Sequence, residues 1–237
     1  PVGDKGAVLL TVNVASCDET QTSFTNTAVA EGRAPDGSFT IDDSVDGSDP
    51  DGDDGDNNPD EASGTTIIFD QLPSLGIAKR NVETELLPDG SANVTFEFNL
   101  ENFGNVNLSE ISMIDDLAAT FGAPCAVSIV NLTSDDFIVN SDYDGITITE
   151  LLAAGNDLPV ADKGAILLTV NVASCDDTQT SFTNTATAEG TAPDGSVTTD
   201  DSVDGSDPDG DDGDNNPDEA SGTPVTFDQM PSLGVAK

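Results

Sequence analysis

The chain repeats itself with an offset of 158 residues, and this repeat constrains its architecture more than any other feature. Residues 1–79 align with residues 159–237 and differ from them at 12 positions, whereas residues 42–65 and 200–223 are identical. The length of 237 residues equals one and a half periods. We therefore expect residues 1–72 to be the C-terminal half of a preceding repeat unit and residues 73–231 to be one complete unit. Residues 232–237 would begin the next unit of a longer tandem array.

Short runs of alternating apolar and polar residues, such as AILLTVNV and NVTFEFNL, indicate that each unit is built from β-strands. Turn sequences such as PDG separate the runs. The predicted strands cover residues 75–87, 92–101, 107–115, 126–131, 146–149, 165–172, 181–188, 197–201 and 225–227. DDLAAT and ELLAAG are the segments that suggest a helical turn. About nine short strands per unit predict an all-β fold of tandem immunoglobulin-like β-sandwich repeats.

The composition excludes several classes of function. With 46 acidic and 6 basic residues the formal charge is −40, which excludes a nucleic-acid partner because phosphate binding needs a basic surface. No apolar run approaches the ~20 residues of a membrane span. The chain has no histidine, so no Ser-His or Cys-His nucleophile can form, and we expect no enzyme activity. The alternating runs contain enough apolar residues to build a core despite the charge.

The three cysteines follow the repeat. Cys17 corresponds to Cys175, and the counterpart of Cys125 would precede residue 1, so each whole unit has two cysteines. We expect a disulfide between Cys125 and Cys175, which suits an extracellular, oxidising location. The alternative is a pair of buried free thiols. Cys17 would pair with a cysteine of the preceding chain.

The acidic segment DPDGDDGDNNPDE occurs at residues 49–61 and again at residues 207–219. Aspartates at alternate positions can converge on one calcium ion, which takes 6–8 oxygen ligands, and the glycines allow the chain to curl around it. The segment differs from an EF-hand loop because Asp212 stands at the glycine position and Asp218 at the final glutamate position. A plain solvated linker is the alternative. The candidate ligands are Asp46, Asp49, Asp51, Asp53, Asp54, Asp56, Asn58, Asp60, Asp204, Asp207, Asp209, Asp211, Asp212, Asp214, Asn216 and Asp218. Other acidic pairs, such as Asp115 and Asp116, flank predicted strands and are expected in surface loops.

The order of the motifs resembles the conserved β-sandwich repeats of large bacterial surface proteins. FNLENFGNVNLSEISMIDDLAATFG, LLAAGNDLPVADKGAILLTVNV, FTNTATAEGTAPDG and DDSVDGSDPDGDDGDNNPDE together resemble these repeats across essentially the whole chain. The resemblance implies an extracellular, immunoglobulin-like stalk or adhesin with an aspartate-rich calcium-loop tail. It implies no chemical activity.

These observations predict a structural segment of a calcium-stabilised extracellular or cell-surface bacterial filament or adhesin stalk. Calcium is the expected cofactor, and bound calcium would order the junctions between units. The expected partners are copies of the chain joined head to tail, with other cells or surfaces as further candidates. The alternative function is a cation-sequestering or surface-adhesion module that uses the same acidic loops.

Overall fold

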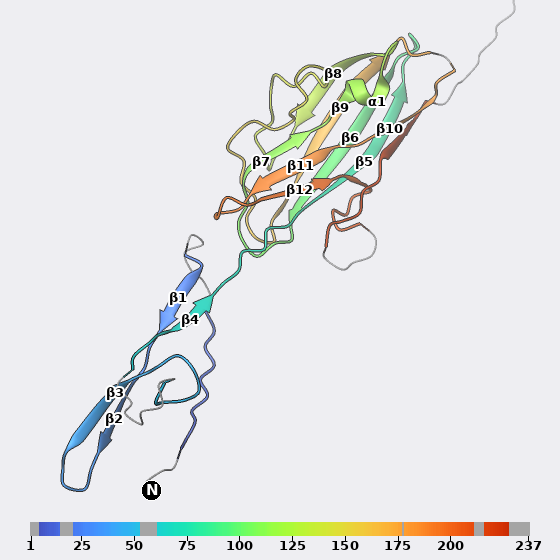
Figure 1. The fold of residues 1–237 in the computed structure, drawn as a ribbon. Coiled ribbons are helices and arrows are strands. Elements are labelled where there is room, and N and C mark those ends of the chain that lie inside the picture. The colour runs from blue at the N-terminus through green and yellow to red at the C-terminus, as the bar shows by residue number, and fades with distance from the viewer. Residues whose placement is uncertain (1–4, 15–20, 53–60, 177, 211–215, 228–237) are drawn as a thin grey trace, which may run out of the picture. The chain divides into compact units, whose positions relative to one another are not determined.

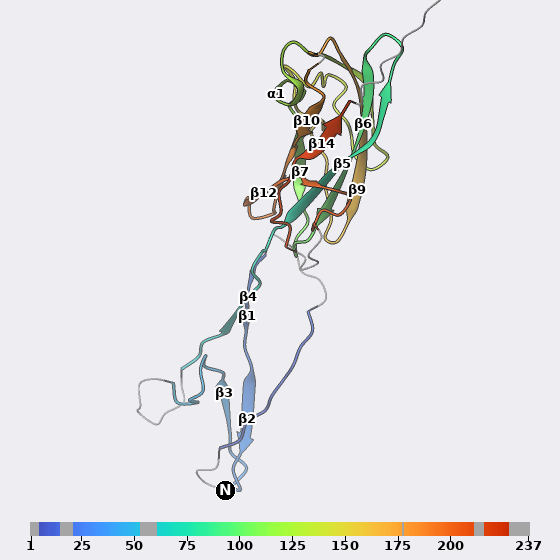
Figure 2. The same cartoon turned by 90° about the vertical axis from the view of Figure 1, so that its right-hand side faces the viewer.

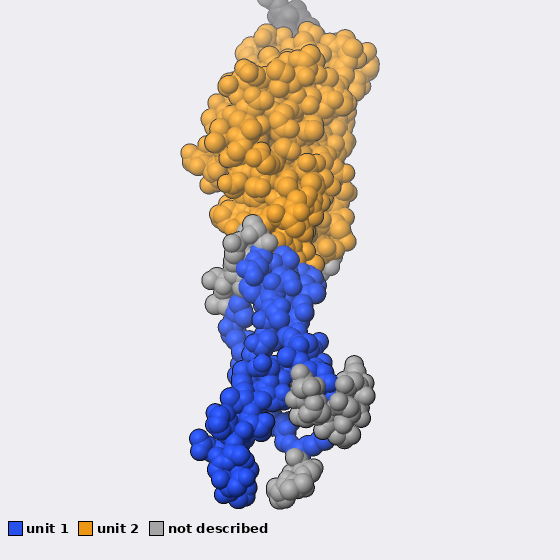
Figure 3. All heavy atoms as spheres, turned by 60° about the vertical axis from the view of Figure 1, so that its left-hand side comes forward, with its two compact units in different colours: residues 1–70 blue, residues 71–237 orange. Residues whose placement is uncertain are grey.

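The computed structural model describes residues 5–14, 21–52, 61–176, 178–210 and 216–227. The chain divides into two compact units, Pro1–Asp70 and Gln71–Lys237 (Figure 3). Each unit is described below by itself. Within the described residues, no helix has the length and apolar character needed to cross a membrane.

The larger sheet of the second unit has five strands in the order β13-β5-β6-β9-β8 (Figure 1). Its long central strands alternate because each presents one face to the core: in β6, every second residue from Ala92 to Asn102 is buried. The same pattern runs along β9, so that Phe96 of β6 lies opposite Leu168 and Phe98 opposite Ile166. The strand bounds are β5 Leu75–Leu86, β6 Ala92–Asn102, β8 Ala126–Thr133, β9 Lys163–Ala173 and β13 Val203–Asp204.

A second layer covers the buried face of this sheet. It contains the three-stranded sheet β12-β11-β7 and the pair β10-β14, and its buried side chains join those of the larger sheet in one hydrophobic core (Figure 2). The short helix α1, Leu117–Phe121, closes one side, where Phe121 contacts Phe182 and Phe227. The bounds are β7 Ser109–Ile114, β10 Ser181–Asn184, β11 Thr187–Thr191, β12 Val197–Asp201 and β14 Thr223–Thr226. The second unit is therefore an all-β sandwich, as the sequence predicted.

The first unit contains the counterparts of four of these strands, each displaced by one repeat period. They are β1 Ser23–Asn26, β2 Val29–Arg33, β3 Phe39–Asp43 and β4 Thr65–Ile68. β1 pairs with β4 in the register that joins β10 to β14, and β2 pairs with β3 in the register that joins β11 to β12. The repeated half-unit therefore specifies these pairings, since the described residues of the first unit form them as well.

Four sequence-based assignments differ from the structure. The strand predicted at residues 146–149 is a turn, in which the Asp144 carboxylate accepts hydrogen bonds from the backbone amides of residues 146–148. ELLAAG is extended rather than helical, because Leu151 N donates to Met113 O and Ala153 N to Ile138 O. The single strand predicted at residues 181–188 is divided into β10 and β11, which pair with different strands. The two-residue strand β13 was not predicted, whereas DDLAAT contains the expected helical turn.

Candidate functional site in the acidic loop

Two serines anchor the base of the acidic loop. Ser202 Oγ accepts a hydrogen bond from Ala186 N, and Ser221 Oγ accepts one from Asp204 N. The first unit has the same two bonds, with Ser44 Oγ and Ser63 Oγ as acceptors. The loop base thus adopts one structure in both copies, and the identical sequence is sufficient to specify it.

A tight turn follows at residues 207–210. Gly210 N donates to Asp207 O, and Gly210 has a φ of 70°, in the left-handed region that favours glycine. The Glu219 carboxylate lies against Gly210, because a Cβ placed there would stand 3.0 Å from Glu219 Oε2. Asp209 is 6% exposed although it is charged and lies in a loop. The turn therefore places the Glu219 carboxylate, from the far end of the loop, against Gly210.

The loop packs on the first strand of its own unit. Val203 and Asp204 of β13 pair in parallel with Ala78 and Lys79 of β5. A Cβ on Gly76 would stand 2.7 Å from the carbonyl oxygen of Pro208, so only a glycine lets the loop approach β5 this closely. The described part of the loop therefore stabilises the edge of the five-stranded sheet at the beginning of β5.

Asp200 connects the loop to β5 electrostatically. Its Oδ2 accepts a 2.8 Å hydrogen bond from Ile77 N. Burial raises the pKa of Asp200 to about 7, and the neighbouring Asp201 and Glu219 carboxylates add to this rise. Because neighbouring negative charges contribute to the raised pKa of Asp200, a cation bound in the loop would lower that pKa.

The predicted calcium ligands fall into two groups. Asp53, Asp54, Asp56, Asn58, Asp60, Asp211, Asp212 and Asp214 lie outside the described residues. The described candidates are Asp46, Asp49, Asp51, Asp204, Asp207, Asp209, Asn216 and Asp218. Among the residues that the structure describes, no three acidic, histidine or cysteine side chains are grouped closely enough to hold a metal ion. Calcium binding therefore stays a prediction.

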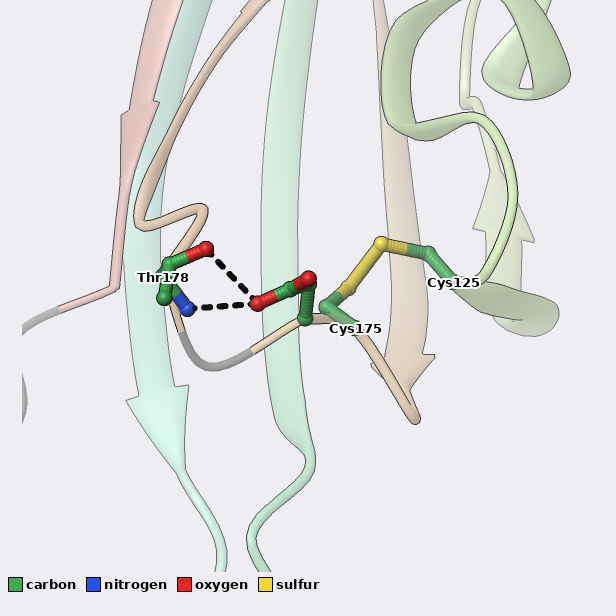
Figure 4. The surroundings of a disulfide bond; sticks show 4 residues. Cys125, Cys175 and Thr178 are labelled. Atoms are coloured by element: carbon green, nitrogen blue, oxygen red, sulfur yellow. Dashed lines mark hydrogen bonds between the residues drawn. A yellow bond between two sulfur atoms is a disulfide. The ribbon is translucent and has the colours of Figure 1, made fainter.

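Cys125 and Cys175 are joined by a disulfide, as the sequence analysis expected (Figure 4). It links the start of β8 to the segment after β9, where the Asp176 carboxylate accepts hydrogen bonds from Thr178 N and Oγ1. Cys17 lies outside the described residues. The pairing fits the repeat, because both cysteines belong to the same unit.

Sequence reasoning missed a charged group in the core. Lys79 Nζ and Asp115 Oδ1 lie 2.9 Å apart, and both side chains are fully buried. The expectation that Asp115 occupies a surface loop was wrong: it follows β7 directly and points inward. One signal was visible, since Lys79 continues the inward alternation of Leu75 and Ile77.

The comparisons with known proteins leave the family open. No family model and no curated protein matches the sequence. Among solved structures, the chain is similar to BcpA, the major pilin subunit of Bacillus cereus, with a TM-score of 0.33 and 7% identity. A variant of that subunit gives a TM-score of 0.32 and 8% identity. Each match covers 78% of this chain and 64% of the pilin chain, less than two thirds of its length.

Proposed function

We propose that this chain is a structural segment of an extracellular bacterial filament or adhesin stalk, built from 158-residue β-sandwich units and stabilised by calcium in its acidic loops. The proposal rests on the repeat, on the all-β sandwich of the second unit and on its disulfide. In such a filament every unit forms a complete sandwich. The first unit therefore needs another segment of chain to supply the strands that correspond to β5, β6, β7 and β8.

The observation that carries this proposal is a difference in burial between identical or closely similar repeat positions. Val8 is 97% exposed whereas its counterpart Ile166 is 0% exposed, and Leu10 is 75% exposed whereas Leu168 is 0% exposed. In the second unit these residues belong to β9, which pairs with β6 on one side and β8 on the other. Among the residues that the structure describes in the first unit, none forms a strand beside residues 5–14, so Val8 and Leu10 join no sheet there.

A segment equivalent to residues 71–158 would cover these apolar side chains, because it supplies β5, β6, β7 and β8 in the second unit. Covering them removes apolar surface from water, which stabilises the assembly by about 25 cal/mol per Å². We assign this role to the corresponding segment of a preceding repeat in the same filament. Chain-to-chain continuity of this kind gives a stalk its length and stiffness.

Calcium would act on the edge of each sandwich. The acidic side chains of the loop offer oxygen ligands, the Glu219 carboxylate lies against Gly210, and Asp209 is buried. Asp207, Asp209 and Asp218, with the aspartates between them in sequence, would provide ligands of the kind that calcium prefers. Because the loop packs on β5, metal binding would also stabilise the first strand of the unit.

Calcium titration by isothermal calorimetry tests the cofactor, and electron microscopy of the native assembly tests the array. We expect a small, saturable number of ions per loop at ~10⁻⁴–10⁻³ M, the range of extracellular calcium modules. Images should show a rod with a regular repeat that becomes flexible in chelator. Binding of many weak ions without saturation, together with an unchanged rod, would favour the alternative cation-sequestering or adhesion module, which the net charge of −40 also suits.

A further inference from the structure

A pocket of about 670 Å³ lies at one end of the second unit. Its walls are the turn that joins β5 to β6, the end of β9 with the segment that follows it, and Phe227. Phe227 follows β14 directly and is the last residue that the structure describes. The pocket therefore lies beside the point at which the chain leaves the sandwich, which we call the exit end of the unit.

Two apolar side chains of the pocket are partly exposed. Leu86 lines the pocket and is 40% exposed. Phe227 is half-buried, because its ring packs against the core rings of Phe121 and Phe182, with ring centres 6.4 Å and 5.4 Å away, and also lines the pocket. An apolar side chain that entered the pocket would remove the exposed parts of Leu86 and Phe227 from water, which favours binding.

The two carboxylates of the pocket are already hydrogen-bonded within their own turns. Asp89 Oδ1 accepts hydrogen bonds from Ser91 N at 3.0 Å and from Ser91 Oγ at 2.7 Å. Asp176 Oδ1 accepts hydrogen bonds from Thr178 N at 2.9 Å and from Thr178 Oγ1 at 2.7 Å (Figure 4). None of the described residues that line the pocket is basic. The pocket therefore suits an apolar occupant.

The repeat places the start of a following unit close to this pocket. Phe227 corresponds to Phe69, and residue 233 corresponds to Leu75, the first residue of β5. The five residues 228–232 would thus separate Phe227 from the first strand of the next sandwich. An extended chain spans at most about 3.6 Å per residue, so that strand would begin within roughly 20 Å of Phe227.

The entry end of a unit, where β5 begins, holds the preceding residues firmly. Leu72 N donates a 2.7 Å hydrogen bond to Asn105 Oδ1, and Asn105 N donates a 3.1 Å hydrogen bond to Leu72 O. Gln71 Oε1 accepts a 3.0 Å hydrogen bond from Asp194 N. Although its backbone is fixed in this way, Leu72 is 64% exposed. The entry end therefore presents a positioned apolar side chain to its surroundings.

We propose that the residue equivalent to Leu72 in a following unit inserts into the exit-end pocket of the unit before it, and that this contact fixes the angle between consecutive units. In this chain that residue is Met230, which lies outside the described residues. Met230 is three residues beyond Phe227, so the chain keeps it within about 11 Å of the pocket wall. Methionine is unbranched and makes favourable sulfur–aromatic contacts, which suits a pocket walled by Phe227. The inference rests on the proposed function, because it needs units in tandem.

A longer chain can supply the following unit. It consists of residues 1–237 followed by a second copy of residues 80–227, which continues the repeat because Lys237 corresponds to Lys79. Leu72→Met in this chain provides a matched control at the equivalent position of the second unit. The pocket that would receive this control side chain needs the counterparts of residues 86–92, which would precede residue 1.

Oxidation by dilute hydrogen peroxide, followed by peptide mass spectrometry, measures the accessibility of each methionine. We expect Met230 to be oxidised roughly tenfold more slowly than the methionine at position 72. Met113 is 0% exposed, so it should be oxidised most slowly in both copies and shows that both sandwiches are folded. Equal rates at positions 72 and 230, with Met113 protected, would overturn the proposal.

Two variants identify the pocket as the cause of the protection. Leu86→Asp, made only in the first copy, places a charge on the pocket wall and should raise the oxidation rate of Met230 to that at position 72. Val130→Asp, at a 55% exposed position of β8, should leave the rate unchanged. Protection of Met230 that persists in folded Leu86→Asp would refute the assignment to this pocket. Because the longer chain joins its units covalently, failure here leaves the proposed filament standing, whereas a native assembly without the 158-residue repeat would contradict the filament itself.

Discussion

Replacement of leucine by alanine should change the free energy of unfolding by very different amounts at Leu168 and at its repeat counterpart Leu10. Leu168 is fully buried in β9, opposite Phe96 of β6 and Leu132 of β8, whereas its counterpart Leu10 is exposed. Leu168→Ala should lower the free energy of unfolding by about 3 kcal/mol, within the range of about 2–5 kcal/mol for fully buried leucines. Leu10→Ala should change it by less than about 0.5 kcal/mol, as is usual for exposed positions.

Urea unfolding can separate the two units. The chain has one tyrosine and no tryptophan, so fluorescence of the buried Tyr143 reports on the second unit, while far-ultraviolet circular dichroism reports on both units. We expect Leu168→Ala to shift the fluorescence midpoint with an unchanged slope, and Leu10→Ala to leave both signals unaltered. If Leu10→Ala lowered the circular dichroism midpoint as much as Leu168→Ala does, residues 5–14 could not be an uncovered counterpart of β9.

Three further predictions concern the loops and the disulfide. The pKa of Asp200 is raised in the folded state from 3.8 to about 7, so its stabilising contribution is complete below pH 3.8 and is lost as the pH rises through 7. Asp200→Asn should therefore gain stability over wild type between pH 4 and pH 8, by roughly 1–2 kcal/mol after allowance for solvent screening, and Asp42→Asn should not. Calcium at 100 times its dissociation constant should stabilise the second unit by about 2.7 kcal/mol, and Asp209→Asn should reduce this gain whereas the exposed control Asp157→Asn should not. Replacing both cysteines of the disulfide, which are 50 residues apart, with serine should cost up to ~4 kcal/mol in urea unfolding.

Local pattern was sufficient to predict much of the sandwich. The inward alternation of β6 and β9 is visible in NVTFEFNL and AILLTVNV, because each of these strands buries only one face. The register of β10 with β14 and of β11 with β12 is specified within the repeated half-unit, since the first unit reproduces it. These features depend on the repeated segment or on simple periodicity.

Features set by distant contacts were not predictable. The segment around Leu151 is apolar enough for a helix, but its backbone bonds to Met113 instead. Asp115 looks like a surface residue in sequence, and only the arrangement of β5, β7 and β10 places it beside Lys79 and Asn184. In the acidic loop, composition predicts cation binding, whereas the close packing of Pro208 on Gly76 depends on tertiary structure.

Hydrogen exchange at residues 5–14 is the most direct test of the central claim that the first unit is completed by a segment like residues 71–158. A longer chain can be made by placing a second copy of residues 73–158 before Pro1, which recreates the Leu158–Pro159 sequence. We predict that the amides of residues 5–14 exchange rapidly in the original chain and become as protected as those of β9 in the longer one. Rapid exchange at residues 5–14 in both chains, with β9 still protected, would contradict the account.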